Sequence, residues 1–121
     1  MHAALRFPHI PADSAAWLAH SGLRALTLGG RTLLPIVQGG MGIGVSAHRL
    51  AGSVAALGGV GTLSSVDLRR HHPDLMAATG QLPAAEAAKR AIDAANLEAL
   101  RREIRAARAL SPGMGLLAVN V

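Results

Sequence analysis

Four glycines lie close together where an apolar run of the sequence gives way to a predicted helix. They occupy positions 39, 40, 42 and 44, within the stretch PIVQGGMGIG that spans 35–44. Glycine loses more conformational entropy on folding than any other residue, so such a cluster needs a compensating gain. A ligand that lies against backbone without Cβ atoms would provide that gain. The cluster therefore predicts a ligand site at this turn.

One pattern in this turn matches the dinucleotide-binding fingerprint. The run Gly42-Ile-Gly44-Val-Ser-Ala47 has the G-x-G-x-x-(G/A) spacing, and Asp67 falls near the expected position of a ribose-binding acid. The residues QGGM, however, separate the apolar run from the first fingerprint glycine, whereas a dinucleotide turn follows its strand directly. The competing interpretation is that the end of the strand itself, at Gly39 and Gly40, contacts the ligand.

A histidine pair beside an acid is the other group with possible chemistry. His71 and His72 precede Pro73 and Asp74. Adjacent histidine side chains point in different directions, and no further ligand lies at the spacing of a zinc site. We therefore predict an ordered loop here rather than a metal centre. We also expect His48 to be exposed at the start of a helix.

The elements that would position these residues follow from hydrophobic periodicity and turn signals. The second half of 32–38 and residues 60–65 are short apolar runs typical of buried strands. Between them, 47–57 has helical spacing, and Ser46 is a suitable N-cap. Strand, helix and strand joined by short turns form a βαβ unit, which implies parallel strands. We interpret Gln38 as a structural hydrogen-bonding residue.

The other segments flank this unit. A short helix is predicted from Asp13 to Gly22, and a hairpin around Gly29-Gly30. Residues 66–83 are predicted to be irregular. A long helix over 84–110, with a solvated charged face, precedes a third strand at 116–121. The positions of that helix predicted to point inward are Ile92, Leu97, Leu100, Ile104 and Ala107.

Two stretches resemble the nitronate monooxygenase family of flavin enzymes. Residues 35–65, PIVQGGMGIGVSAHRLAGSVAALGGVGTLSS, are similar to its Pro-Ile-(Ile/Val)-Gln segment, its Leu-Ala-x-x-Val helix and its Gly-Gly-(Leu/Val)-Gly-Thr-(Ile/Leu)-Ser segment. The end of the sequence, LLAVNV, is similar to the family's Gly-Val-Asn strand. The resemblance implies FMN as cofactor, and it assigns cofactor binding to Gly39, Gly40, Met41 and Asn120. It assigns no catalytic residue and no metal ligand within these 121 residues.

The resemblance also implies a fold class and an activity. The fold would be the N-terminal portion, about three strands, of a (β/α)8 TIM barrel with parallel strands. Residues 1–121 would form one partial FMN-binding domain, with an extension and hairpin at 1–30 and the first three barrel strands with their helices at 31–121. The activity would be FMN-dependent oxidation of alkyl nitronates by dioxygen. The family's catalytic half is expected beyond these residues, so the 121-residue piece alone would be inactive.

Two alternatives to this function remain open. Flavin-dependent enoyl reductases share much of the same pattern, so an oxidoreductase of that kind is the alternative among enzymes. From a different class, the chain would be a non-catalytic nucleotide-binding module or an inactive truncated remnant.

The composition argues against several classes of partner. The formal net charge is +5, but only Phe7 and Trp17 are aromatic, so the base-stacking platforms of a single-strand nucleic-acid binder are missing. With no cysteine, neither a disulfide nor a thiolate metal site can form. The start of the sequence lacks the pattern of a secretory signal, and the longest uncharged stretch, 50–66, is too short to span a membrane. We expect a cytoplasmic protein with small-molecule partners, a nitronate and dioxygen, and without nucleic-acid or membrane partners; a homo-oligomer is compatible with this.

Overall fold

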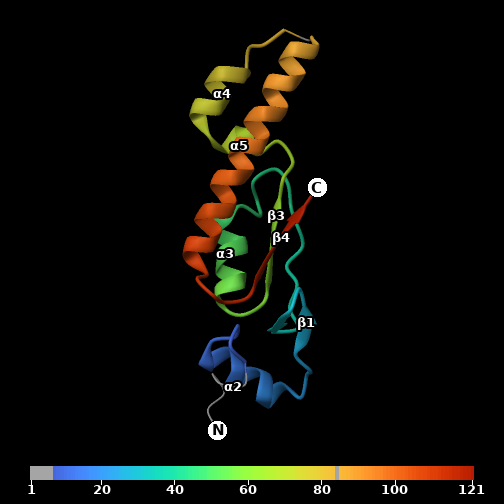
Figure 1. The fold of residues 1–121 in the computed structure, drawn as a ribbon, viewed down its shortest axis with the longest axis vertical. Helices are drawn as coiled ribbons and strands as arrows, with labels where there is room; N and C mark the ends of the chain where they lie inside the picture. Colours follow the sequence, from blue (N-terminus) through green and yellow to red (C-terminus); the bar gives the residue numbers. More distant parts are fainter. Residues whose placement is uncertain (1–6, 84) are drawn as a thin grey trace.

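The computed structural model describes residues 7–83 and 85–121, and its elements follow one another along a long axis (Figure 1). At one end lie helix α2 (Ala12–Ser21) and a hairpin of β1 (Leu26–Leu28) and β2 (Arg31–Leu33). The middle contains α3 (His48–Ala56), β3 (Val60–Ser64) and β4 (Leu116–Asn120). The 3-10 helix η1 (Leu68–His71) and α4 (Pro73–Thr79) pack against the long helix α5 (Glu86–Leu110).

The N-terminal elements form as predicted. Asp13 lies in the first turn of α2, and Gly22 ends the helix in the left-handed conformation with φ 73°. Gly29 and Gly30 also have positive φ, which allows the tight two-residue turn between the antiparallel strands β1 and β2. This end of the molecule has a small hydrophobic core, which consists of Ile10, Ala15, Leu18 and Leu34.

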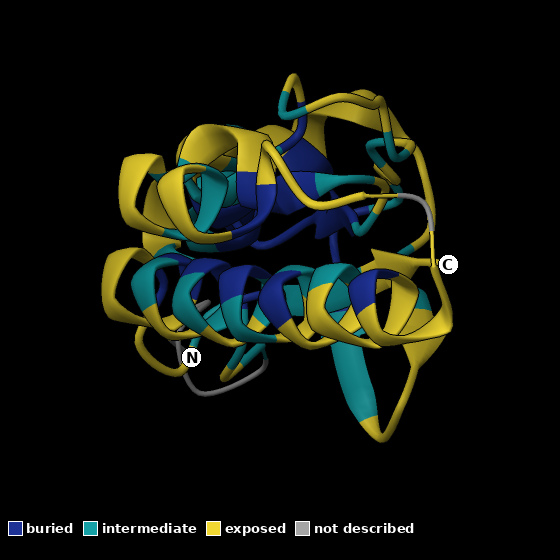
Figure 2. Ribbon diagram, turned by 90° about the horizontal axis from the view of Figure 1, so that it is seen from above, coloured by how far each residue is buried: buried dark blue, intermediate teal, exposed yellow. Residues whose placement is uncertain are grey.

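The strands β3 and β4 form a parallel pair, in register from Val60 opposite Leu116 to Ser64 opposite Asn120. Helices α3 and α5 pack against each other on one side of this pair (Figure 1). Every residue of β3 is buried, and Figure 2 shows buried residues gathered in the interior between the helices and the strands. From residue 48 onward, the predicted order of helix, strand, long helix and strand is therefore confirmed as α3, β3, α5 and β4; Ala84, the predicted first residue of the long helix, lies outside the described residues.

Short side chains form most of the buried face of α5. Its buried residues are Ala88, Ala95, Ala99, Glu103 and Ala107. The prediction was right for Ala107 but wrong for Leu97, which is 49% exposed; the other predicted inward residues are half-buried, namely Ile92, Leu100 and Ile104. Alanine lets α5 approach its neighbours more closely than leucine would, because a close-packed interior leaves no space for larger side chains.

The prediction of an N-terminal portion of a (β/α)8 TIM barrel is wrong. The fold of the described residues is α/β with four strands in two small sheets, β1 antiparallel to β2 and β3 parallel to β4. Residues 35–38, predicted to be the first of three parallel strands, meet β3 only at an isolated parallel bridge between Val37 and Val60.

The sequence of 35–40 explains why no full strand forms beside β3. Pro35 has no N–H to donate, and Gly39 and Gly40 are poor strand formers. Gln38 lies between Pro35 and these glycines, and its side chain makes the hydrogen bonds to β3 that the backbone of a longer strand would otherwise make. Its Nε2 donates to the Thr62 carbonyl at 3.1 Å, and its Oε1 accepts from the Thr62 N–H at 3.0 Å. The hydrogen bonding between this segment and β3 therefore ends with a side chain and does not continue through the backbone.

The segment 66–83 was predicted to be irregular, but it contains η1 and α4. Pro73 takes the first position of α4, where its missing N–H costs no helical hydrogen bond. Arg102 of α5 donates to both carboxylate oxygens of Asp74 at 2.9 Å, and this contact lowers the pKa of Asp74 to about 2. This ion pair links the start of α4 to a residue of α5 that lies 28 positions away in the sequence.

Across residues 7–83 and 85–121, no helix combines the length and the apolar character that crossing a bilayer requires.

Candidate functional site

The residues predicted to contact a cofactor lie where the parallel segments end. Gly39, Gly40 and Met41 follow the bridge between Val37 and Val60, and Asn120 is the last residue of β4. An ideal Cβ on Gly40 would lie 2.7 Å from the Cβ of Asn120, so these two residues are in close contact. We call the surface formed by Gly39, Gly40, Met41 and Asn120 the Gly39–Asn120 edge.

The glycines of the turn differ in what surrounds them. The Cβ positions of Gly40, Gly42 and Gly44 are taken by the side chains of Asn120, Val66 and His71, respectively. Gly39 alone among the four has no heavy atom within 4 Å of an ideal Cβ, and it is exposed. Packing within the chain thus accounts for three of the glycines, and open backbone that a ligand could cover remains at Gly39.

Two carboxamides stand at the ends of neighbouring segments, and their hydrogen bonding differs. Gln38 is engaged by the backbone of Thr62 through both its donor and its acceptor, which confirms its structural role. The carboxamide of Asn120 is exposed and makes no hydrogen bond to any residue of 7–83 or 85–121. Asn120 therefore offers a donor and an acceptor together at the Gly39–Asn120 edge.

Met41 presents its side chain rather than its backbone to this edge. Its N–H donates to the Ser46 hydroxyl at 2.6 Å, and its carbonyl accepts from the Ser46 N–H at 3.0 Å. Ser46 is fully buried and closes the loop in this way, so the prediction that it caps the following helix is wrong; α3 begins after Ala47 without a side-chain cap. The Met41 backbone amide is thus committed, while the residue is 45% exposed.

A buried carboxylate joins three elements on the other side of the turn. Glu103 of α5 is 4% exposed, and its Oε2 accepts from the His48 N–H at 2.8 Å and lies 2.6 Å from His48 Nδ1. Its Oε1 lies 3.1 Å from His72 Nε2. We call these three residues the Glu103 cluster. It ties α5 to the first turn of α3 and to the start of α4.

The cluster fixes the orientation of one imidazole. Because Nδ1 of His48 faces the carboxylate, Nε2 is the ring nitrogen that is left to contact another group. His48 lines a pocket of about 330 Å³ together with Arg49 and His71. The side chain of His48 is 36% exposed, so the prediction that His48 is simply exposed is corrected to a half-buried, hydrogen-bonded residue.

The electrostatics of Glu103 reflect two opposing causes. Burial raises the pKa of its carboxyl group, whereas the His48 backbone N–H and the imidazoles of His48 and His72 lower it, and the net result is a lowered pKa. A positive helix N-terminus adds to the preference for the charged form. The carboxylate form of Glu103 is therefore the form that the fold requires.

This lowered pKa predicts a loss of stability in acid. A carboxyl group whose pKa falls on folding contributes stability that is fully present above its ordinary value of 4.5 and is lost as the pH falls through the folded value. We expect the free energy of unfolding, measured with urea, to decrease as the pH is lowered from 4.5 to 3.

Other paired carboxylates also titrate in this range, so the comparison that matters is with a Glu103→Gln variant. The variant should lose less stability than the wild type between pH 4.5 and 3. Equal losses in the two proteins would show that Glu103 does not contribute to the acid sensitivity.

The Glu103 cluster also bears on the dinucleotide interpretation. In that interpretation a pyrophosphate lies at the N-terminus of the helix after the glycines. In this chain the N-terminus of α3 already holds a carboxylate, through the His48 N–H. Asp67, the proposed ribose-binding acid, is in turn ion-paired to Arg69 and Arg70. Both groups that a dinucleotide would need are thus occupied by other parts of the chain.

The histidine pair is divided between two contacts. His71 Nε2 lies 3.3 Å from the Ile43 carbonyl, whereas His72 belongs to the Glu103 cluster. Asp74 is held by Arg102. In the part of the chain that the structure describes, no group of three or more histidine and acidic side chains is placed to hold a metal ion.

The sequence interpretation missed Glu103, because it assigned the charges of the long helix to a solvated face. A signal was available. Glu103 is four residues from both Ala99 and Ala107, so it is the one charged residue on a stripe of alanines. A carboxylate on the apolar stripe of a helix requires a buried partner.

No protein-family model, curated protein or solved structure matches this chain.

Proposed function

We propose that the Gly39–Asn120 edge contacts the ring of a flavin, and that the chain serves an FMN-dependent oxidation of alkyl nitronates by dioxygen. The observation that carries the proposal is the Asn120 carboxamide, which has no hydrogen-bond partner among the described residues and lies against Gly40, the neighbour of the uncovered Gly39. The resemblance of residues 35–65 and 115–121 to nitronate monooxygenases supports the choice of cofactor and of substrate.

The residues at this edge suit the chemistry of the flavin ring. One side of the isoalloxazine presents alternating carbonyl and N–H groups, and a carboxamide supplies the matching donor and acceptor. A flat ring can approach Gly39 because no Cβ stands in the way. The polarizable side chain of Met41, which is 45% exposed, supplies a contact for an aromatic ring.

The same edge does not suit a phosphate group. The nearest helix N-terminus, that of α3, is occupied by Glu103, and the edge contains no cationic side chain. The proposal therefore assigns ring contact, and not phosphate contact, to these residues. When bound, FMN would accept electrons from the substrate; Asn120 would orient the ring, and Gly39 with Met41 would shield one part of it from water.

A test follows from the restriction to ring contact. Lumiflavin, which has the ring alone, should bind the chain about as tightly as FMN, with binding measured by quenching of flavin fluorescence. Asn120→Ala should weaken both ligands about fivefold, because a ring polar atom loses its partner at a cost of about 1 kcal/mol.

The matched control is Gln81→Ala. Gln81 is another exposed carboxamide, remote from this edge in the connection between α4 and α5, and its removal should leave both affinities unchanged. Equal affinities of the wild type and Asn120→Ala would contradict the proposal. Binding of FMN but not of lumiflavin would contradict it as well, since it would place the contact at the phosphate.

A further inference from the structure

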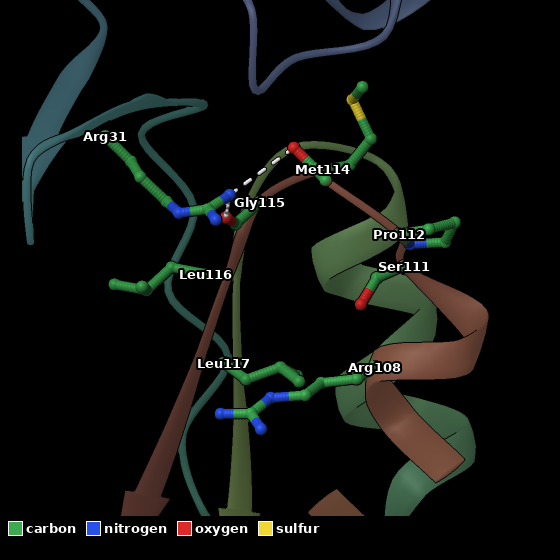
Figure 3. A pocket seen from close by; sticks show the side chains of 9 residues that line it. Arg31, Arg108, Ser111, Pro112, Met114, Gly115, Leu116 and Leu117 are labelled. Atoms are coloured by element: carbon green, nitrogen blue, oxygen red, sulfur yellow. Dashed lines mark hydrogen bonds between the residues drawn. The ribbon is translucent and has the colours of Figure 1, made fainter. Parts of the chain in front are cut away.

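A pocket of about 350 Å³ lies at the opposite end of β4 from Asn120 (Figure 3). Its walls come from the first residues of β4, from the turn that precedes them, and from two arginines on other elements. Figure 3 shows Arg31 reaching toward this turn from the hairpin, and Arg108 reaching across from the end of α5. The pocket thus lies between the hairpin and a segment distant from it in sequence, which runs from the end of α5 to the start of β4.

The two arginines differ in how firmly they are held. Arg31 donates from Nη1 to the carbonyls of Gly115 at 3.0 Å and Gly113 at 3.4 Å, which fixes its guanidinium and leaves its remaining N–H groups available (Figure 3). Arg108 makes no hydrogen bond or ion pair through its side chain with any residue of 7–83 or 85–121. One guanidinium is therefore pre-positioned, and the other is available to a ligand.

No negative charge balances these two cations. None of the residues that line the pocket is acidic, and within the described residues no carboxylate lies within ion-pairing distance of Arg31 or Arg108. Ser111, the hydroxyl residue of the wall, donates its proton to the Ala107 carbonyl at 2.9 Å. The pocket therefore has unmatched positive charge and lacks an internal anion.

The other side chains that line the pocket are apolar. Leu116 and Leu117 line the pocket from opposite sides of β4, and Figure 3 shows the side chain of Leu117 on the side of Arg108, whereas that of Met114 points away from both arginines. A volume of about 350 Å³ lies at the lower end of the range for small-molecule sites. Guanidinium groups match the planar, two-oxygen geometry of a carboxylate, and the apolar walls suit a short hydrocarbon chain attached to it.

From these features we infer that the pocket between Arg31 and Arg108 binds a small organic carboxylate with a short aliphatic chain. The carboxylate meets the two guanidinium groups, and the chain lies against the side chain of Leu117. This site is separate from the Gly39–Asn120 edge and does not depend on the proposed flavin contact.

The inference is tested by titrating the 121-residue chain with acetate, butyrate and hexanoate, followed by two-dimensional NMR of the backbone amides at constant ionic strength. We expect saturable shifts of the amides of Gly113–Leu117. The affinity should rise about fourfold for each added methylene group, and it should be lost with hexanol, which has the chain but no charge.

Arg108→Gln should weaken hexanoate at least about tenfold, since a charge-assisted hydrogen bond is lost. Arg105→Gln is the matched control, because Arg105 is an exposed arginine of the same helix that does not line the pocket. Asn120→Ala should also leave hexanoate binding unchanged, which separates this site from the flavin proposal.

Three results would overturn the inference. One is the absence of saturable shifts at Gly113–Leu117 with hexanoate. Another is equal hexanoate affinity in the wild type and Arg108→Gln. The third is binding of inorganic phosphate as tight as that of hexanoate, which would show a bare oxyanion site without a role for the apolar walls.

Discussion

Among the glycines that lie outside turns, Gly61 is the one whose substitution by alanine is expected to destabilise the chain most. Gly61 lies in the middle of β3, and an ideal Cβ there would overlap the carbonyl oxygen of Ala51 and lie 2.9 Å from its Cα. These are backbone atoms of α3, so no side chain can move aside. The helix would have to shift away from the strand.

The cost of that shift is large because the contact is central. Ala51 and Ala55 of α3 are both fully buried, and β3 is buried throughout. Added volume in a packed core typically costs about 1–3 kcal/mol, and here we expect about 3 kcal/mol or more, since backbone must move. The measurement is urea unfolding, with the midpoint and the slope compared between variant and wild type.

Gly39→Ala is the matched control for Gly61→Ala. An ideal Cβ on Gly39 meets no heavy atom within 4 Å, so we expect a change within about 0.5 kcal/mol. The same variant should weaken lumiflavin binding, because the added methyl group stands where the ring approaches. If the Gly61→Ala variant were as stable as the Gly39→Ala variant, this result would contradict the close packing of α3 against β3.

Glu103→Gln is expected to destabilise the chain by about 3 kcal/mol at pH 7, since breaking a buried charged network by removing one partner typically costs 3–5 kcal/mol. The glutamine fills the same volume but carries no charge. Its amide group cannot accept hydrogen bonds from both His48 and His72 as the carboxylate does, and the first turn of α3 loses its anion.

Glu98→Gln is the control for Glu103→Gln. Glu98 lies on the same helix and contacts Arg102 at 3.2 Å, but this pair is on the surface, and we expect a change below about 1 kcal/mol. Urea unfolding of the two variants at pH 7 gives the comparison. Equal effects would mean that the Glu103 cluster contributes no more than a surface ion pair.

Local sequence signals determined most of the elements. The Gly29-Gly30 turn predicted the hairpin, Gly22 predicted the end of α2, and apolar periodicity predicted α3, α5, β3 and β4. Each of these signals acts within a few residues, because helical hydrogen bonds and tight turns join neighbours in the chain. The sequence also indicated Asn120 and the glycine turn as a candidate site, and the structure places Asn120 against Gly40.

The tertiary structure decided what these elements do together. The side chain of Gln38 forms hydrogen bonds with the backbone of Thr62, which is 24 residues away, and so takes the place of backbone pairing beside β3. The three-stranded parallel sheet expected of a barrel therefore does not form. Glu103 becomes buried because His48, 55 residues away, brings the start of α3 to it.

The roles of the four glycines depend on the tertiary structure in the same way. Nothing in the sequence of the turn separates Gly39 from Gly40, yet Asn120 fills the space beside one and leaves the other open. Which side chain fills which space is set by the packing of segments that are far apart in sequence, whereas periodicity and turn signals describe only the few residues around each position.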